Sequence, residues 1–244
     1  MSAPVTQQAP SSAALTATCA ELNALHDSDR SSDRFSPQKW DVVRRGSLTR
    51  LPFATRWGGL EEDLPGTMRV FEALGWGCRD GGLRFSLCTH VVSAGVPLQR
   101  FGSPELQDRH LRSLCDGRVI GAHAISEPVA GSDALAMRTT AERRPGGYVL
   151  DGTKAFVTNG PVAGVFVVYA RTSAQAGPFG HILAHARCRS SREGECRWIS
   201  QSLASDAEPQ VGRPEVMAPL GNAMGFIHAQ ERWASAFESR GGGP

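Results

Sequence analysis

Apolar residues recur at near-fourfold spacing in two stretches of the first half of the chain, and this spacing is typical of helices. The stretch over about residues 82–96 predicts a buried helix, whose apolar positions are Leu83, Leu87, Val91 and Ala94. The stretch from Thr67 to Gly75 predicts a second helix, whose apolar positions are Met68, Phe71 and Leu74.

Capping residues place two further helices. Ser36-Pro37 and Ser103-Pro104 each combine an N-cap residue with a proline at the first helical position, and Gly117 marks a helix end. The breaks between the four helices are short, which favours one compact helical domain over residues 35–118.

From Val119 to Arg171 the pattern changes to short runs rich in β-branched and aromatic residues. Asp151-Gly152 stands between two such runs and predicts a hairpin turn, and Asn159-Gly160 predicts a second turn. The fold class is therefore α+β, with a helical domain followed by an antiparallel, barrel-like β-domain over residues 119–180.

The two ends of the chain lack a sustained period. Residues 1–34 are rich in Ser, Ala, Asp and Thr, and we expect a disordered extension with one or two helical turns near Ala20–His26. Residues 181–244 mix arginine and serine with single apolar residues, and we expect them to be irregular.

Composition is that of an ordinary globular protein. Hydrophobic residues make up 41% and charged residues 20% of the 244 positions. The net charge of +2 is too balanced to favour nucleic-acid or membrane binding, and no apolar run approaches the roughly 20 residues of a membrane span. The N-terminus lacks the pattern of a signal peptide, so we expect a cytoplasmic location.

The six cysteines form no CxxC pair, which favours free thiols. The only clustered candidates for metal ligands are His181, His185, Cys188 and Cys196, and their spacing matches no common zinc pattern. We therefore expect no metal site.

Two stretches in the β-region resemble the flavin-binding signatures of acyl-CoA dehydrogenases. The first runs from Ala124 to Asp133 (AISEPVAGSD), and the second from Tyr148 to Gly160 (YVLDGTKAFVTNG). They occur in the family's order and spacing, and the segments Arg56–Leu60 and Phe101–Gln107 add weaker matches. The resemblance covers roughly residues 35–180 and implies the family's helical N-terminal domain, its flavin-binding middle domain and an FAD cofactor.

The resemblance also implies roles for individual residues. Ser126 corresponds to the residue that donates to the N1–C2=O edge of the flavin, Thr158 to the one whose hydroxyl meets flavin N5, and Phe156 to the aromatic packed on the ring. Gly131 and Ser132 correspond to a loop that lets backbone N–H groups approach the pyrophosphate, and Ser132 also to a contact with the thioester substrate. The remaining cofactor-binding positions are His123, Ala124, Ile125 and Val157, with His123 standing where many members have Tyr or Phe.

Each signature also has an ordinary structural interpretation. Ser126-Glu127-Pro128 alone is typical of a strand that ends in a turn, and Asn159-Gly160 alone of a hairpin turn. Glu127, a carboxylate before proline, is more often a local hydrogen-bond acceptor than a catalytic acid, so we do not nominate it. Only the two signatures together indicate a flavin site.

The implied activity is FAD-dependent α,β-dehydrogenation of an acyl thioester on CoA or an acyl-carrier protein, with a separate electron-transfer acceptor. Two alternatives stay open: a flavin-dependent oxidase or monooxygenase on the same scaffold, and a truncated, non-catalytic remnant that binds flavin.

Family members continue into a C-terminal helical domain, which usually supplies the catalytic base and most contacts of the homo-oligomer. The chain ends at Pro244 without a match to that domain, so no catalytic residue is identified and the chain is expected to be incomplete. One explanation for the loss of the pattern is a frameshift after about Gly180.

Overall fold

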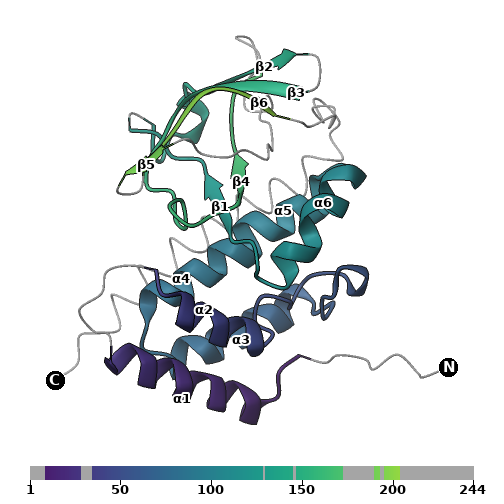
Figure 1. Ribbon diagram of the computed structural model, residues 1–244, viewed down its shortest axis with the longest axis vertical. Helices are drawn as coiled ribbons and strands as arrows, with labels where there is room; N and C mark the ends of the chain where they lie inside the picture. The colour runs from purple at the N-terminus through teal and green to yellow at the C-terminus, as the bar shows by residue number, and fades with distance from the viewer. Residues whose placement is uncertain are drawn as a thin grey trace. The chain divides into compact units, whose positions relative to one another are not determined.

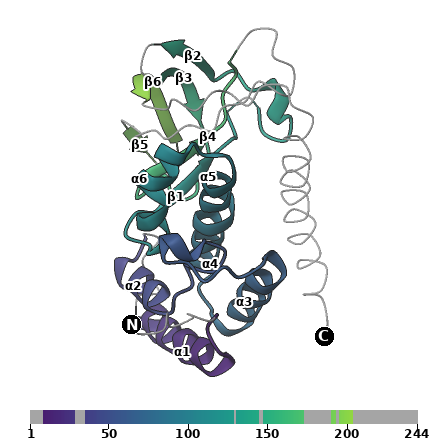
Figure 2. The ribbon, with the colours of Figure 1, turned by 90° about the vertical axis from the view of Figure 1, so that its right-hand side faces the viewer.

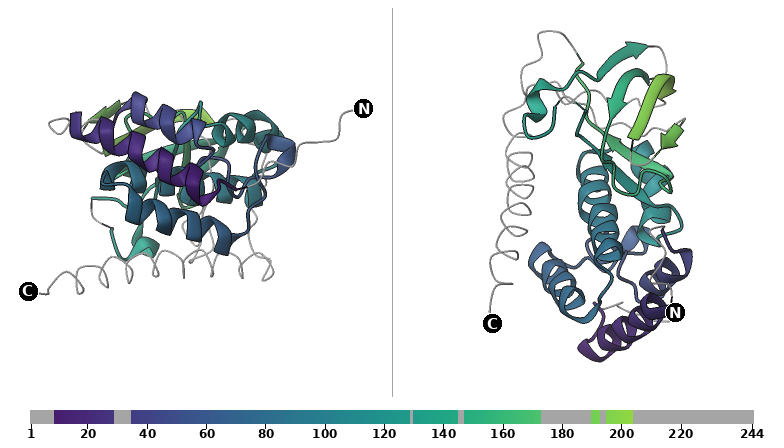
Figure 3. Two further views of the ribbon diagram at one scale, coloured as in Figure 1. Left: turned by 90° about the horizontal axis from the view of Figure 1, so that it is seen from below. Right: turned by 90° about the vertical axis from the view of Figure 1, so that its left-hand side faces the viewer.

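The computed structural model describes residues 9–28, 35–128, 130–144, 147–172, 190–192 and 195–203. Helices make up the first part of the described chain and strands the second, and Figure 1 shows the two parts next to each other. Figure 2 and Figure 3 show the same separation of helices and strands from other directions. In the described residues, no helix is long and apolar enough to cross a membrane.

Side-chain caps define where several of the helices begin. Ser36 and Ser103 accept hydrogen bonds from the third backbone N–H of their helices, as the sequence predicts, and Asp63 and Asp80 do the same for two more. The helices are α1 (Ser12–Ser28), α2 (Pro37–Arg45), η1 (Thr55–Trp57), α3 (Leu64–Gly77), α4 (Gly81–Cys88), η2 (Thr89–Gly95), α5 (Val96–Phe101) and α6 (Pro104–Cys115).

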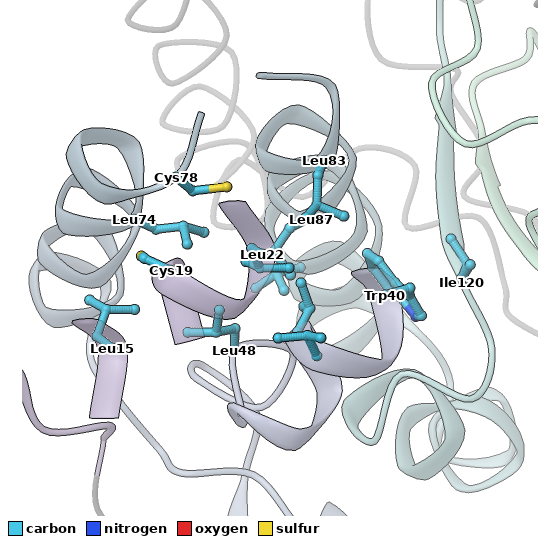
Figure 4. Packing of buried hydrophobic residues seen from close by; sticks show 13 residues of the cluster. Leu15, Cys19, Leu22, Trp40, Leu48, Leu74, Cys78, Leu83, Leu87 and Ile120 are labelled. Carbon is cyan, nitrogen blue, oxygen red and sulfur yellow. The ribbon is translucent and has the colours of Figure 1, made fainter. Parts of the chain in front are cut away.

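Helix α1 contains the helical turns expected near Ala20–His26, but it begins at Ser12, so the expected disorder is wrong for residues 12–19. Leu15, Cys19 and Leu22 recur every three or four residues and are buried in the helical core. Figure 4 shows Leu15 and Cys19 near Leu74 and Cys78, and Leu22 near Leu87. The segment is mostly polar, so this narrow apolar stripe is hard to recognise in the sequence. Packing of the stripe against other helices stabilises α1.

The buried helix predicted over about residues 82–96 is confirmed, and its second half is the π-helix η2, which continues into α5. Between α4 and α5 the chain forms the π-helix η2, and the N–H of Val96 bonds to Val91 O, five residues back. This wider turn comes directly before Pro97, which has no N–H for a regular helical bond. A Cβ atom on Gly95 would lie 2.3 Å from the ring of Phe53, so the side of η2 next to Phe53 requires glycine.

The strands form two sheets. Strands β1 (Gly121–Ala124) and β4 (Val165–Val168) pair in parallel, whereas β2 (Thr140–Arg144), β3 (Gly147–Lys154), β6 (Glu195–Leu203) and β5 (Ser190–Arg192) form an antiparallel sheet in the order β2-β3-β6-β5. A bridge between Thr140 and Arg171 joins the edge of one sheet to the chain that leaves the other. The prediction of antiparallel pairing is confirmed for the larger sheet and wrong for β1 and β4, because the chain between them makes the long crossover that parallel strands need.

The predicted hairpin turn at Asp151-Gly152 is wrong. Both residues lie inside β3, where the register against β6 shifts between Leu150 and Asp151. Gly152 has φ 152°, and a Cβ atom there would lie 2.7 Å from Thr139 Cα. The glycine therefore permits a close approach of two backbones within an irregular strand. Asn159-Gly160 does form a turn, in which Gly160 N donates to Val157 O.

Strands β5 and β6 lie in the segment that the sequence predicts to be irregular, so that prediction is wrong for residues 190–192 and 195–203. Strand β6 pairs along β3 from Tyr148 to Lys154. Backbone hydrogen bonds define this pairing, and they do not require a regular alternation of side chains. The other residues of 181–244, including His181, His185 and Cys188, lie outside the described residues.

A neutral histidine joins the helices to the first strand. His90 is fully buried in η2, where its Nδ1 accepts from Gly121 N at 2.9 Å and its Nε2 lies 3.0 Å from Leu114 O. Since Nδ1 is an acceptor, Nε2 carries the proton. Burial lowers the pKa of His90 to about 4. A second proton would point at the N–H of Gly121, so this junction requires the neutral ring.

The chain should lose stability as pH falls from about 6.5 to about 4. The histidine of the unfolded chain binds a proton near the ordinary pKa of 6.5, whereas folded His90 resists protonation down to about 4. The neutral form of His90 thus stabilises the fold fully above pH 6.5. Between pH 6.5 and about 4, each pH unit lowers the free energy of unfolding by up to about 1.4 kcal/mol. Denaturant unfolding across this range should show a shallower pH dependence for His90→Gln than for the parent. His26→Gln, on the partly exposed His26, is the control, and equal pH dependence in all three proteins would contradict this account.

Candidate functional site

One backbone hydrogen bond brings the two signatures together. Ser126 follows β1, and Ala155 follows the end of β3. The N–H of Ala155 donates to Ser126 O at 2.9 Å, although the residues are far apart in sequence. The two segments that contain the predicted flavin contacts, one beginning at Ser126 and the other at Ala155, therefore lie next to each other where they begin.

Glu127 holds the turn between Ser126 and Gly131. Its backbone N–H and C=O both pair with Ala130, at 2.9 and 3.2 Å. Its carboxylate accepts from Thr139 N at 2.9 Å, Thr139 Oγ1 at 2.5 Å, Arg138 N at 2.6 Å and Lys154 Nζ at 2.8 Å. Burial raises the pKa of Glu127, but these hydrogen bonds outweigh it and lower the pKa to about 2. The interpretation of Glu127 as a local acceptor is confirmed.

Lys154 is the buried cation of the site, and its side chain has no exposed surface. Its Nζ donates to Glu127 Oε1 at 2.8 Å and to Ile125 O at 2.9 Å. Burial lowers the pKa of Lys154, whereas the carboxylate of Glu127 opposes this effect. Because a buried charge is tolerated only when it is paired and hydrogen-bonded, the position of Lys154 depends on Glu127.

Several groups are available to a ligand. Within the described residues, the hydroxyls of Ser126 and Thr158 form no hydrogen bond. The side chain of Phe156 is 87% exposed on a backbone with φ 55°, a conformation that is uncommon for an aromatic residue. Gly131 and Ser132 are exposed, and nothing lies within 4 Å of a Cβ built on Gly131. Unused donors beside an exposed aromatic ring and an open glycine loop fit a flavin nucleotide.

The other predicted cofactor-binding residues are placed differently. Ala124 and Val157 are buried in the β-domain core, so only their backbones are available to a ligand. Ile125 contributes the carbonyl that Lys154 binds. The ring of His123 packs edge-on against Tyr169 at 5.1 Å, and burial, with the charge of Lys154, lowers the pKa of His123 to about 4. His123 is therefore neutral at pH 7.

Asn159 is a structural residue of the site whose sequence context indicates only a turn. Its side-chain amide donates to Ser86 O and Gly121 O, each at 3.0 Å, and its Oδ1 accepts from Ser86 Oγ at 2.6 Å. It thereby attaches the segment after Thr158 to α4 and β1. The sequence signal is the asparagine itself, since φ is 66° there and asparagine tolerates this conformation better than most residues.

The described residues offer little for other chemistry. They contain no group of three or more His, Cys, Asp or Glu side chains that could hold a metal ion. The cysteines Cys19, Cys78, Cys88 and Cys115 are free, as the sequence predicts for them. Glu127 has a carboxylate in the site, but its four hydrogen bonds keep it ionised and fixed in place.

Two family models match successive parts of the chain. The acyl-CoA dehydrogenase N-terminal domain matches residues 6–118, and the acyl-CoA dehydrogenase middle domain matches residues 122–186. These segments correspond to the helical part and to most of the β part.

Several proteins of known function are similar to this chain. L-prolyl-[peptidyl-carrier protein] dehydrogenase of Serratia sp. is 44% identical over 124 residues, which cover 51% of this chain and 32% of that protein. Cyclohex-1-ene-1-carbonyl-CoA dehydrogenase of Geobacter metallireducens is 40% identical over 121 residues, which cover 49% of this chain and 31% of that protein. The matched regions thus span about a third of these relatives.

Solved structures have the same architecture. The structure described as "FAD complex of PigA" superposes with a TM-score of 0.71 at 33% identity, covering 82% of this chain and 56% of that one. The prolyl acyl carrier protein oxidase AnaB superposes with a TM-score of 0.66 at 27% identity, covering 83% and 59%. Because both family models match in chain order and the fold agrees with these structures, the chain belongs to the acyl-CoA dehydrogenase family.

Proposed function

We propose that this chain is the helical and flavin-binding part of an FAD-dependent dehydrogenase that introduces an α,β double bond into an acyl thioester. The observation that carries the proposal is the juxtaposition of the two signatures, with Phe156 exposed and the hydroxyls of Ser126 and Thr158 not hydrogen-bonded to any described residue. FAD, when bound, supplies the acceptor for the hydride that leaves the β-carbon.

The residues of the chain would bind and orient this cofactor. Ser126 would donate toward the N1–C2=O edge, where electron density increases on reduction, and Thr158 would donate at N5. Phe156 would pack on the ring, Gly131 and Ser132 would let backbone N–H groups approach the pyrophosphate, and Ser132 would also contact the thioester. Ile125 and Val157 contribute through their backbones.

The thioester carrier is the finer part of the proposal. The relative from Serratia acts, by its name, on a prolyl group held by a peptidyl-carrier protein, and so does a second relative from Pseudomonas fluorescens at 33% identity. Their similarity favours a carrier-protein thioester over acyl-CoA for this chain. Other relatives are named acyl-CoA dehydrogenases, so a CoA thioester is the alternative substrate.

A second candidate function is oxidation with molecular oxygen as the electron acceptor. AnaB is named an oxidase, and its fold matches this chain. Stoichiometric peroxide during turnover would favour the oxidase, whereas dependence on an added acceptor would favour the dehydrogenase. A non-catalytic, flavin-binding remnant is the third candidate, and it predicts flavin binding without turnover of any thioester.

Other expectations follow from family membership and from the sheet edges. We propose that the two sheets close into a barrel-like domain, which the Thr140–Arg171 bridge supports. Homo-oligomers, a separate electron acceptor and a cytoplasmic location remain predictions from the sequence.

Replacing Thr158 by valine should weaken FAD binding about three- to tenfold, because it removes one hydrogen bond while preserving the shape of the side chain. Flavin fluorescence titration of the purified chain measures this change. Thr140→Val, at an exposed position of β2, is the matched control and should bind FAD as the parent does. Equal affinity of both variants and the parent would show that Thr158 does not contact the flavin.

The 244-residue chain, loaded with FAD, should turn over prolyl-carrier-protein or acyl-CoA thioesters at least about 10²–10⁴-fold more slowly than ordinary enzymes. Glu127 is held by four hydrogen bonds, and the other two carboxylates of the signatures, Asp133 and Asp151, are exposed, with no described contact that would hold either one against a thioester. The assay follows reduction of an artificial acceptor. Rates of about 1–10³ per second would show that the chain carries its own base.

A further inference from the structure

The Glu127–Lys154 ion pair is connected to all three segments that would contact the flavin. Its side chains are 3% and 0% exposed, and the charged atoms are 2.8 Å apart. The proposed function does not use either charge in the reaction. The hydrogen bonds of the pair are directed instead at backbone groups next to Ser126 and at both ends of the loop that contains Gly131, and Lys154 leads along the chain into the segment that contains Thr158.

Glu127 closes the base of the loop from Gly131 to Met137. Before the loop, the backbone of Glu127 pairs with Ala130. After the loop, its carboxylate accepts from the N–H groups of Arg138 and Thr139, at 2.6 and 2.9 Å. Both ends of the loop that contains Ser132 are therefore bonded to one residue, and no other side chain of the described residues makes these contacts.

Lys154 holds the other two segments. Its ammonium group donates to Ile125 O, directly before Ser126, at 2.9 Å. As the last residue of β3, it also leads into Phe156 and Thr158, and the next residue, Ala155, bonds to Ser126 O. The hydrogen bonds to the carbonyl groups of Ile125 and Ser126 thus determine where the segment that leads to Thr158 starts relative to Ser126.

Stability alone is a poor reason for such an arrangement. A buried ion pair is often no better for stability than apolar side chains of similar volume, because both charges lose their hydration. The chain nevertheless has a lysine and a glutamate here, and each also forms hydrogen bonds with backbone groups. Directional contacts of this kind determine geometry, which apolar contacts do less well.

We propose that Glu127 and Lys154 are positioning residues of the flavin site, which hold Ser126, the Gly131–Met137 loop and the Phe156–Thr158 segment at a fixed spacing. This proposal rests on the proposed function for the identity of the ligand. The geometric part concerns residues of the chain itself, so it is tested without cofactor as well as with it.

The experiment compares the full chain with Glu127→Gln, Lys154→Met and Thr139→Val. Glu127→Gln leaves the ammonium group unpaired, whereas Thr139→Val removes only one donor to Glu127 and retains both charges. Glu142→Gln is the matched control, since the Glu142–Arg144 pair has the same 2.8 Å separation but is 63% and 58% exposed.

The first measurement is amide hydrogen exchange without cofactor. In Glu127→Gln and Lys154→Met, exchange should accelerate about tenfold or more at Ala130, Arg138, Thr139 and Ala155, whose N–H groups are hydrogen-bonded, while helices α2 and α4 remain protected. Thr139→Val should show a smaller increase at the same amides, and Glu142→Gln none. If the helices also lose protection in a charge variant, that variant has unfolded, and Thr139→Val decides the question.

The second measurement is the affinity for FAD and the midpoint potential of the bound flavin. The charge variants should bind FAD about tenfold more weakly, with a shifted potential, because the donors to N1–C2=O and N5 are displaced. Unchanged exchange in the segments, or faster exchange with the parent's affinity and potential, would overturn the positioning role. If the parent itself takes up no FAD, the proposed function fails for this chain, while the exchange data still decide whether the pair determines the geometry.

Discussion

A lysine side chain without exposed surface places a strict demand on its surroundings. The ammonium group of Lys154 can remain charged only if nearby oxygens replace the water that it has lost. Glu127 and the carbonyl of Ile125 provide these oxygens, and Glu127 in turn requires the donors at Arg138 and Thr139. The contacts that satisfy this one buried charge therefore determine the local arrangement of four segments. These are the ends of β1 and β3, the turn after Ser126 and the loop before β2.

The helical part restrains the same region from the other side. Asn159 bonds to Ser86 of α4 and to Gly121 of β1, and His90 bonds to Gly121 and Leu114. Gly121 is the shared point of both contacts, so the first strand cannot move without disturbing α4, η2 and the turn after Thr158. Neutral groups make this connection, whereas charged groups hold the signatures together.

How much of this the sequence predicts depends on how local each signal is. The serine caps and the helices of residues 35–118 were predictable because capping and near-fourfold spacing act within a few residues. The hairpin turn predicted at Asp151-Gly152 was wrong. Gly152 instead permits a close contact with Thr139 inside an irregular strand, and that contact is not local in the sequence. Only the Ala20–His26 part of helix α1 was predicted, because three buried residues stabilise the whole helix against residues that are distant in the sequence. The signatures indicated the proposed flavin site, but not that Lys154 would be buried and paired with Glu127.

The contacts that build the site have a consequence for how the chain acquires its structure. Lys154 bonds to residues 27 and 29 positions away, and Asn159 to residues 38 and 73 positions away. Closing loops of this length is slow compared with forming helices from neighbouring residues. We therefore expect the helices to form early on the folding pathway and the flavin site to close last. Because synthesis proceeds from the N-terminus, the helical part would emerge from the ribosome and begin to fold before the residues of the proposed flavin site are complete.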